Sequence, residues 1–208
     1  MDAKFYLPPE INIITDYLEV GASNRPGLAL SPTYLTIHNT DNADFGADAM
    51  MHAKYMRGPD ARARQVSWHF TVDDKKCVQS LPINEQGWHA GKYPSDKASI
   101  GNKTSIGIEI CENRGINQSD ANNRAALLTA ALLLQIGLDI SSVVPHKHWS
   151  GKWCPHLLLD EQGSISDFIK LVKVELGTLI GTDSLIALNA NRKCTIAKQS
   201  KPHLYKKA

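Results

Sequence analysis

The stretch VVPHKHWSGKWCPH, Val143–His156, places three imidazoles, one thiol, two indoles and two lysines within a short length of chain. Gly151 and Pro155 interrupt any regular periodicity, so the sequence predicts a loop that follows a short apolar strand. Histidine and cysteine are preferred zinc ligands, and indole side chains supply apolar walls. We therefore expect a zinc site with a substrate cleft around it. The alternative is a surface loop whose histidines are incidental.

A matching ligand lies far upstream in the chain. The run YLTIHNT, Tyr34–Thr40, is rich in β-branched and aromatic residues and predicts a short buried strand that ends at His38. Catalytic zinc usually takes three protein ligands and leaves the fourth position to water, and ligands distant in sequence suit a site assembled by the fold. His38, His146 and Cys154 form one such set. Two further histidines of the loop are rival ligands: His148 and His156.

One acidic residue stands out by its surroundings. Ser105–Cys111, SIGIEIC, predicts a strand in which apolar residues alternate with Gly107 and Glu109. A carboxylate is costly to bury without a partner, so we expect a cation or a metal-associated water beside Glu109. The alternative is a surface glutamate on an edge strand. By contrast, His52 falls inside a predicted helix and is expected to be an ordinary packed or solvated residue.

The remaining elements follow from periodicity and turn residues. Ile11–Leu18 is expected to form a short strand or a turn, and the predicted short strands are Ser67–Asp73 and Lys76–Leu81. The last two are expected to form a hairpin across the Asp73–Lys75 turn. The predicted helices are Ala47–Met56, Ser119–Ile136 and Asp160–Leu176, the second of them capped by Ser119 or Asp120. Residues 92–104, KYPSDKASIGNKT, are expected to form a long polar loop of the kind that walls a cleft.

The composition is that of an ordinary folded domain. The chain has 208 residues, of which 42% are hydrophobic and 21% charged, with a formal net charge of +2. This length suffices for one domain with a core and an appendage. No apolar run approaches the roughly 20 residues that span a bilayer, and the N-terminus lacks the pattern of a signal peptide. We therefore expect no membrane span, synthesis in the cytoplasm, and action elsewhere only after release.

The charge is unevenly distributed. From Ser184 to the end there are six basic residues and no acidic one, which leaves 17 basic and 21 acidic residues elsewhere, a net charge of −4. We expect either a solvated terminus or an electrostatic tether to a polyanion. Nucleic acid is not the expected polyanion, because Tyr205 is the one aromatic residue of this segment that can stack on bases.

The four cysteines are scattered, and a chain of this size does not need disulfides to fold. We expect no structural disulfide. Cys77 and Cys111 lie in apolar strand patterns and are expected to be small core residues. Cys154 differs from them because it lies in the polar loop, where a thiol can serve as a ligand.

Five motifs follow one another in order over about residues 12–160: YLTIHNT, SWHFTVDD, GWHAG, SIGIEICEN and VVPHKHWSGKWCPH. Together they resemble the type-2 N-acetylmuramoyl-L-alanine amidases, especially the phage endolysins and Bacillus autolysins. The animal peptidoglycan recognition proteins share that fold. The resemblance implies an α/β fold with a mixed central β-sheet flanked by helices. It also implies a zinc ion, Zn²⁺, at one end of a groove that binds peptidoglycan.

The implied reaction is hydrolysis of the amide between N-acetylmuramic acid and L-alanine, which lyses the bacterial cell wall. The resemblance assigns zinc to His38, His146 and Cys154; some relatives place an aspartate at the third position. It implies that Glu109 transfers the proton, although some relatives use a tyrosine, and that Lys152 stabilises the oxyanion. Five further residues are candidates for the groove: His69, Trp88, His89, Trp149 and Trp153. Loop packing explains the last two equally well.

Two other functions are compatible with the same residues. A non-catalytic peptidoglycan-binding module on this fold is the first alternative, but such relatives replace the zinc cysteine, commonly by serine. A zinc hydrolase of another amide or ester is the second. We expect a catalytic domain at residues 1–176. Residues 177–208 are expected to be a basic tail that contacts anionic wall polymers, or the stub of a wall-binding module. The missing signal peptide favours a phage origin, with a holin opening the route to the wall.

Overall fold

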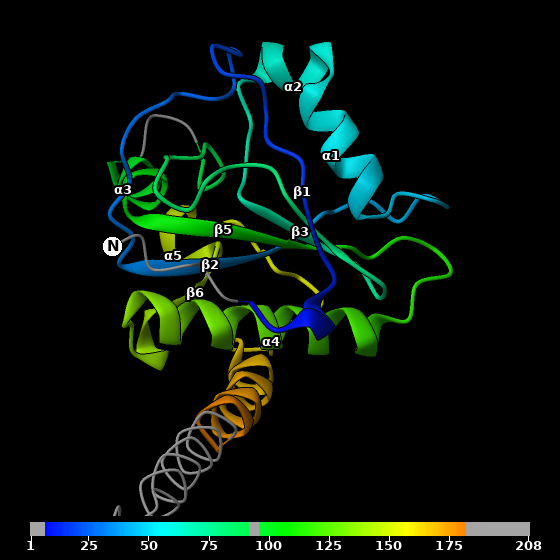
Figure 1. The fold of residues 1–208 in the computed structure, drawn as a ribbon, viewed down its shortest axis with the longest axis vertical. Helices are drawn as coiled ribbons and strands as arrows, with labels where there is room; N and C mark the ends of the chain where they lie inside the picture. Colours follow the sequence, from blue (N-terminus) through cyan, green and yellow to red (C-terminus); the bar gives the residue numbers. More distant parts are fainter. Residues whose placement is uncertain (1–6, 92–95, 182–208) are drawn as a thin grey trace, which may run out of the picture.

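A six-stranded mixed sheet forms the centre of the computed structural model, which describes residues 7–91 and 96–181 (Figure 1). The strand order is β1-β4-β3-β5-β2-β6. The strands are β1 Ile13–Thr15, β2 Tyr34–Asn39, β3 Phe70–Val72, β4 Cys77–Gln79, β5 Ser105–Ile110 and β6 Val143–Pro145. β3 and β4 pair antiparallel, whereas the other neighbouring pairs of this sheet are parallel. The predicted fold class is confirmed.

Side chains of β2 and β5 alternate between the two faces of the sheet. Leu35 and Ile37 of β2 belong to the main hydrophobic core, and so do the three isoleucines of β5. The residues between them, including His38 and Glu109, therefore point to the opposite face. His38 pairs with Glu109 across the parallel strands, and the β2–β6 register puts His146 level with His38. The carboxyl ends of these parallel strands meet at one edge of the sheet. Three predicted site residues, His38, Glu109 and His146, therefore lie next to one another there.

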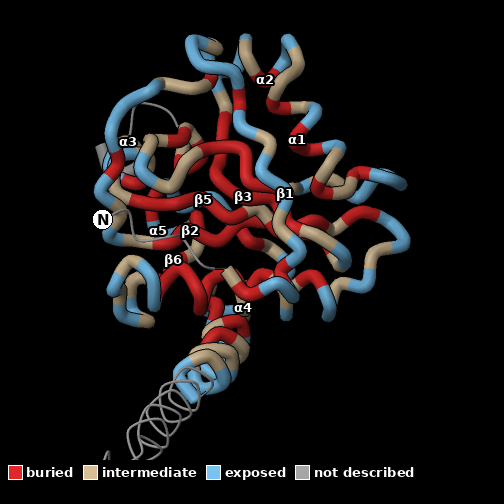
Figure 2. The backbone as a smooth tube through the Cα atoms, in the orientation of Figure 1, coloured by how far each residue is buried: buried red, intermediate tan, exposed pale blue. Residues whose placement is uncertain are grey.

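Helices cover both faces of the sheet (Figure 1). They are α1 Ala49–Arg57, α2 Pro59–Arg64, α3 Asp96–Thr104, α4 Gln118–Ile136 and α5 Lys147–Ser150, with 3-10 turns at Pro9–Ile11 and Ile140–Ser142. The long helix α4 lies under one face and adds its alanines and leucines to the main core. α1 packs on β3 and β4, and α3 packs on β2, β5 and α5. Figure 2 shows the burial concentrated in the sheet and along α4.

The helix α4 agrees closely with the predicted segment Ser119–Ile136, but its cap differs. Asn117 is the N-cap, and its side chain accepts a hydrogen bond from the backbone N–H of Asp120. Neither Ser119 nor Asp120 occupies that position. The helix ends at Gly137, whose φ of 75° is a left-handed conformation that glycine adopts without steric cost.

The prediction of a continuous loop over residues 92–104 is wrong for its second part, because Asp96–Thr104 forms α3. Gly101 lies inside this polar stretch, where a glycine commonly marks a loop. In the structure it is a point of close packing instead. A methyl group at Gly101 would lie 2.6 Å from the Cβ of Ala90 and 2.8 Å from the ring of Trp149. The glycine therefore lets α3 approach its neighbours.

The chain after β6 is not a continuous loop either. Lys147–Ser150 forms the short helix α5, and Gly151 ends it with a φ of 76°.

The predicted strand Ser67–Asp73 is shorter in the structure, where it is β3, because Ser67 forms hydrogen bonds with the backbone of Trp88 instead. The hairpin between β3 and β4 is confirmed. Its turn is held by the Asp73 carboxylate, which accepts hydrogen bonds from the next two lysine N–H groups.

The last helix begins later than predicted. Asp160 accepts hydrogen bonds from the N–H groups of Gln162 and Ser164, so it closes a turn and does not start the helix. The helix covers residues 166–181, and Phe168 and Val172 bury its first turns in the main core. The domain boundary predicted after residue 176 falls within this helix. The rest of the predicted basic tail, residues 182–208, lies outside the described residues.

The sequence predicted neither a structural disulfide nor a membrane-spanning helix. Cys77, Cys111 and Cys154 are free and buried, and Cys194 lies outside the described residues. Cys77 and Cys111 are fully shielded from solvent, as predicted. Among the helices of residues 7–91 and 96–181, none is both long and apolar enough to cross a bilayer.

Candidate metal centre

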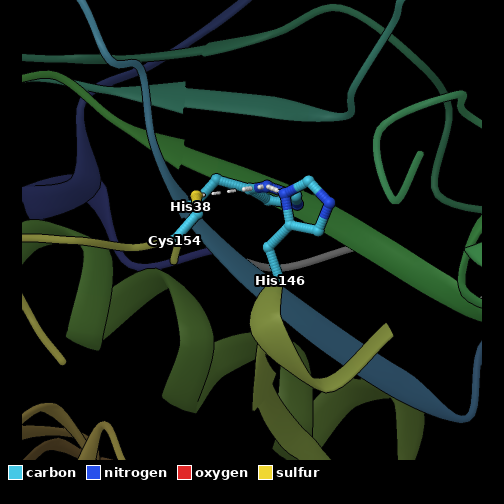
Figure 3. Close-up of side chains that lie close together, drawn as sticks. All are labelled: His38, His146 and Cys154. Atoms are coloured by element: carbon cyan, nitrogen blue, oxygen red, sulfur yellow. Dashed lines mark hydrogen bonds between the residues drawn. The ribbon is translucent and has the colours of Figure 1, made fainter. Parts of the chain in front are cut away.

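Three side chains from separate parts of the chain converge at the carboxyl edge of the sheet (Figure 3). His38 lies near the end of β2, His146 follows β6 directly, and Cys154 comes from the segment after α5. All three are buried, and their ligand atoms lie within 4.8 Å of one another. The structure thus brings together the three ligands predicted from the sequence.

The distances between these atoms suit one tetrahedral ion. The two Nδ1 atoms of His38 and His146 are 3.1 Å apart, and the Sγ of Cys154 is 3.9 Å from the Nδ1 of His38. Zinc–nitrogen bonds of about 2.0 Å and zinc–sulfur bonds of about 2.3 Å at tetrahedral angles give N···N and N···S separations of about 3.3 Å and about 3.5 Å. The two observed separations differ from these values by only a few tenths of an ångström, and the third pair, Cys154 and His146, lies within 4.8 Å. Two imidazoles and a thiol also form a donor set that zinc favours.

The protonation of His146 fits this role. Its Nε2 lies 3.1 Å from the carbonyl oxygen of Ala90, which can only accept, so Nε2 carries the proton. The lone pair of a neutral ring is then on Nδ1, facing His38. Burial lowers the pKa of His146 to about 4, and burial together with repulsion from His146 lowers the pKa of His38 well below its ordinary value. Both rings are therefore neutral at pH 7 and able to bind a cation.

The thiol of Cys154 needs a cation to ionise. Burial and, to a smaller extent, the nearby Glu109 carboxylate raise its pKa to about 12. The metal-free protein therefore keeps this thiol protonated at neutral pH. A coordinating zinc ion deprotonates a thiol outright, so metal binding here releases a proton.

Glu109 lies beside the three candidate ligands. Its Oε1 is 3.7 Å from the Nδ1 of His38, and its Oε2 is buried without a hydrogen-bond partner in the described part of the chain. Burial raises the pKa of Glu109 to about 8, and the charge of Lys152 opposes that shift. A carboxyl group that titrates near neutral pH can both take and return a proton. The expectation of a cation or a metal-associated water beside this residue is compatible with the geometry.

The rival ligands lie elsewhere. His156 Nε2 is 3.3 Å from the Oε2 of Glu112, and with Asp41 these residues form a second, more exposed group. His148 packs its ring on Tyr34 and Trp149. Neither histidine belongs to the cluster of His38, His146 and Cys154.

The three candidate ligands and Glu109 open into a cleft of about 910 Å³. Lys152 also lines it, with its Nζ 3.7 Å from the Oδ2 of Asp41. Both side chains of this ion pair are more than half exposed, so the pair holds Lys152 only weakly. The ammonium group can therefore turn towards a negative charge that forms in the cleft.

The predicted groove residues separate into two groups. Trp88 and His89 line the cleft. His69 is fully buried behind it, donating from Nε2 to the carbonyl oxygen of Glu85 and accepting at Nδ1 from the N–H of Gly107.

The two indoles of the Val143–His156 stretch also lie outside the cleft lining. Trp149 is 4% exposed and donates its indole N–H to the hydroxyl of Thr36. Trp153 is 48% exposed, with the ammonium of Lys147 4.3 Å from its ring centre. Loop packing, the alternative given for both indoles, accounts for Trp149.

The far wall of the cleft was not foreseen. It comes from the loop before α1, from α1 and α2, and from the segment between α2 and β3: Phe45, Met51, His52, Tyr55, Arg64 and Trp68. The rings of Tyr55 and Trp68 stack with an interplanar angle of 22°. Phe45 is 84% exposed at the mouth of the cleft. The polar run DNADFG with one large aromatic residue was the available signal for this wall.

Comparison with known proteins agrees with this arrangement. The family model described as N-acetylmuramoyl-L-alanine amidase matches residues 28–157. The N-acetylmuramoyl-L-alanine amidase XlyA of Bacillus subtilis (strain 168) is 51% identical over 150 residues, covering 72% of this chain and 48% of XlyA. The N-acetylmuramoyl-L-alanine amidase CwlH of the same strain is 47% identical over 154 residues, covering 74% of this chain and 59% of CwlH.

Solved structures agree at the level of the fold. The catalytic domain of XlyA superposes with a TM-score of 0.71 at 48% identity, covering 78% of this chain and 99% of that domain. This chain spans about half the length of the curated relatives that it matches. The residues matched by the family model, 28–157, include the three candidate ligands and the residues that line the cleft.

Proposed function

Because the chain belongs to the N-acetylmuramoyl-L-alanine amidase family, we propose that it hydrolyses the amide between N-acetylmuramic acid and L-alanine in peptidoglycan, with zinc held by His38, His146 and Cys154. One observation supports this most directly: the three ligand atoms lie within 4.8 Å of one another beside Glu109, at the base of a large cleft. The site of action is then the bacterial cell wall.

The residues of the chain divide the chemistry among them. Zinc, when bound, polarises the scissile carbonyl and makes water at the site more acidic. Glu109 takes the proton of the attacking water on a carboxylate oxygen and passes it to the nitrogen of the leaving amine. Lys152 places its charge near the oxygen that becomes negative in the tetrahedral state. The aromatic side chains of Trp88, Tyr55 and Trp68 offer apolar surface for the sugar ring or the stem peptide.

The products of wall digestion test the proposed reaction. Purified protein is added to Gram-positive cell walls, and new alanine N-termini and new reducing sugars are measured in parallel. The proposal expects alanine N-termini without reducing ends. Reducing ends without free amines would identify a glycosidase instead. Wall binding without either product would favour the non-catalytic module.

Lys152→Ala is expected to lower kcat by about 10²-fold, the effect of removing one donor to an oxyanion, while zinc content stays unchanged. Lys147→Ala is the matched control, because this lysine comes from the same segment but lies over Trp153, outside the cleft lining. Turnover on soluble muramyl peptides, with zinc content measured on the same samples, checks both variants. An unchanged kcat for Lys152→Ala would remove this residue from the proposed mechanism.

The basic C-terminal segment is proposed to tether the enzyme to anionic wall polymers. Deletion of residues 184–208 removes six positive charges and no negative one. Adsorption to cell walls should weaken at low salt, and the difference should shrink at high salt, because the Debye length falls from about 30 Å at 0.01 M to about 3 Å at 1 M. Sedimentation with walls at both salt concentrations measures this. A loss of adsorption that is equal at both concentrations would contradict a tether based on charge.

A further inference from the structure

We infer that His89 is a positioning residue, which fixes the tautomer and orientation of the zinc ligand His38 through a hydrogen bond between their rings. The inference rests on the proposed zinc site, and it gives His89 a role in addition to the place in the groove that was expected from the sequence. His89 Nδ1 lies 3.1 Å from the Nε2 of His38, and the two rings meet edge to face at 86°.

The direction of this hydrogen bond follows from the second nitrogen of His89. Its Nε2 lies 3.2 Å from the carbonyl oxygen of Ser105, and a carbonyl oxygen can only accept. The neutral His89 ring therefore carries its proton on Nε2 and has its lone pair on Nδ1. That lone pair accepts from Nε2–H of His38, so the lone pair of His38 is on Nδ1.

As a consequence, the lone pairs on Nδ1 of His38 and Nδ1 of His146 face each other. Nδ1 of His38 and Nδ1 of His146 are 3.1 Å apart, and the backbone carbonyl groups of Ser105 and Ala90 leave neither of them a proton. Two acceptors at this distance repel each other unless a cation lies between them. The hydrogen bonds around the two rings thus prepare both nitrogens for one metal ion. Metal-binding histidines usually make such a bond from their other nitrogen, and here a second histidine accepts it.

Several contacts hold the ring of His89 in this position. The side-chain oxygen of Asn102 accepts hydrogen bonds from the N–H groups of His89 and Ala90, and its amide donates to the carbonyl oxygen of Gly91. On its other side the ring lies directly on Gly107 of β5, where a methyl group would be 2.6 Å from Cγ of His89. The buried Nδ1 of His69 accepts a hydrogen bond from the backbone N–H of Gly107. The position of His89 is therefore built into the fold from two directions.

Two substitutions at position 89 separate the hydrogen bond from the shape of the ring. His89→Asn keeps an acceptor where Nδ1 lies, whereas His89→Phe keeps a flat ring without an acceptor. The expected loss of zinc affinity is about 10- to 100-fold for His89→Phe, the usual effect of removing such a partner, and only a few-fold for His89→Asn. The measurement is the zinc Kd of metal-depleted protein in competition with a chelator, supported by the absorption spectrum of the cobalt form.

His52→Phe is the matched control, since His52 also lines the cleft but makes no contact with His38. Its zinc Kd should equal that of the unaltered protein. If His89→Phe does not fold, Gly107→Ala gives a second measurement, because it displaces the ring while keeping every nitrogen and should weaken zinc binding similarly. Equal zinc affinity in His89→Phe and the unaltered protein would overturn the inference, as would an equal loss in the Asn and Phe variants. Absence of zinc binding by the unaltered protein would instead refute the proposed function.

Discussion

Cys154→Ala is expected to leave a folded protein that neither retains zinc through dialysis nor lyses cell walls. The side chain is 3% exposed and supplies the one sulfur ligand of the candidate centre. Four-ligand zinc sites bind with about 10 to 16 kcal/mol, so one ligand accounts for about 3 kcal/mol, or more than 10²-fold in affinity. Because the remaining histidines are neutral, they still attract zinc, but too weakly to keep it in dilute solution.

The measurement is zinc per protein after dialysis, with thermal unfolding to show that the fold is intact. Cys77→Ala is the matched control, because it removes a buried thiol from the core and leaves the candidate ligands untouched. Cys154→Asp is expected to recover part of the binding, because a carboxylate oxygen is also a zinc ligand. One full equivalent of zinc in Cys154→Ala would refute its assignment as a ligand.

The positions of the site residues on strands were predictable, because side chains along a strand alternate between the two faces of the sheet. In TIHNT and IGIEI, apolar residues alternate with others, so one face packs on α4 and the other bears His38 and Glu109. A histidine placed directly after a short apolar strand, as His146 is, then lies at the same edge. Position along a parallel strand therefore determines position in space. Cys154 lacks that guide, because it lies in irregular chain, and ligand chemistry together with family resemblance selected it.

The remaining features depend on contacts between distant segments. Gly101 lies in the polar stretch that was predicted to be a loop, yet its close contact lets α3 pack on Trp149. Trp149 was expected either in the groove or in loop packing. In the structure its indole is buried and donates a hydrogen bond to Thr36, more than a hundred residues away along the chain. Local patterns do not contain such pairings. The same reason explains why the wall formed by Phe45, Tyr55 and Trp68 was not predicted: it exists only once α1 packs on the sheet.

His69 and His89 show how one motif type can hide different roles. Both belong to motifs that carry the family resemblance, SWHFTVDD and GWHAG, and both were expected in the groove. In the structure His69 bonds to the backbone of β5, and His89 bonds to His38. Since a neutral imidazole has one donor and one acceptor, its partners decide what it does. Those partners come from chain segments that the sequence alone does not bring together.

Glu109→Gln is expected to keep one equivalent of zinc and to lose about 10³- to 10⁴-fold in kcat. The substitution preserves size and the buried position on β5 but removes the group that takes and returns the proton, which contributes about 10²- to 10⁴-fold in general acid–base catalysis. The upper part of that range applies, since one carboxyl group serves both the attack and the departure of the amine. Its buried Oε2 has no hydrogen-bond partner in the described residues, so this oxygen is free to take the proton of the water.

Glu112→Gln is the control for this variant. Glu112 is also largely buried and acidic, but it faces His156 instead of the three candidate ligands. Its kcat should stay within a few-fold of the unaltered protein. Single-turnover rates on a muramyl peptide, measured with zinc content and KM, separate a loss of chemistry from a loss of metal or of substrate binding. Loss of zinc in Glu109→Gln would make this residue a ligand, and an unchanged kcat with zinc retained would require another group, such as a tyrosine, to carry the proton.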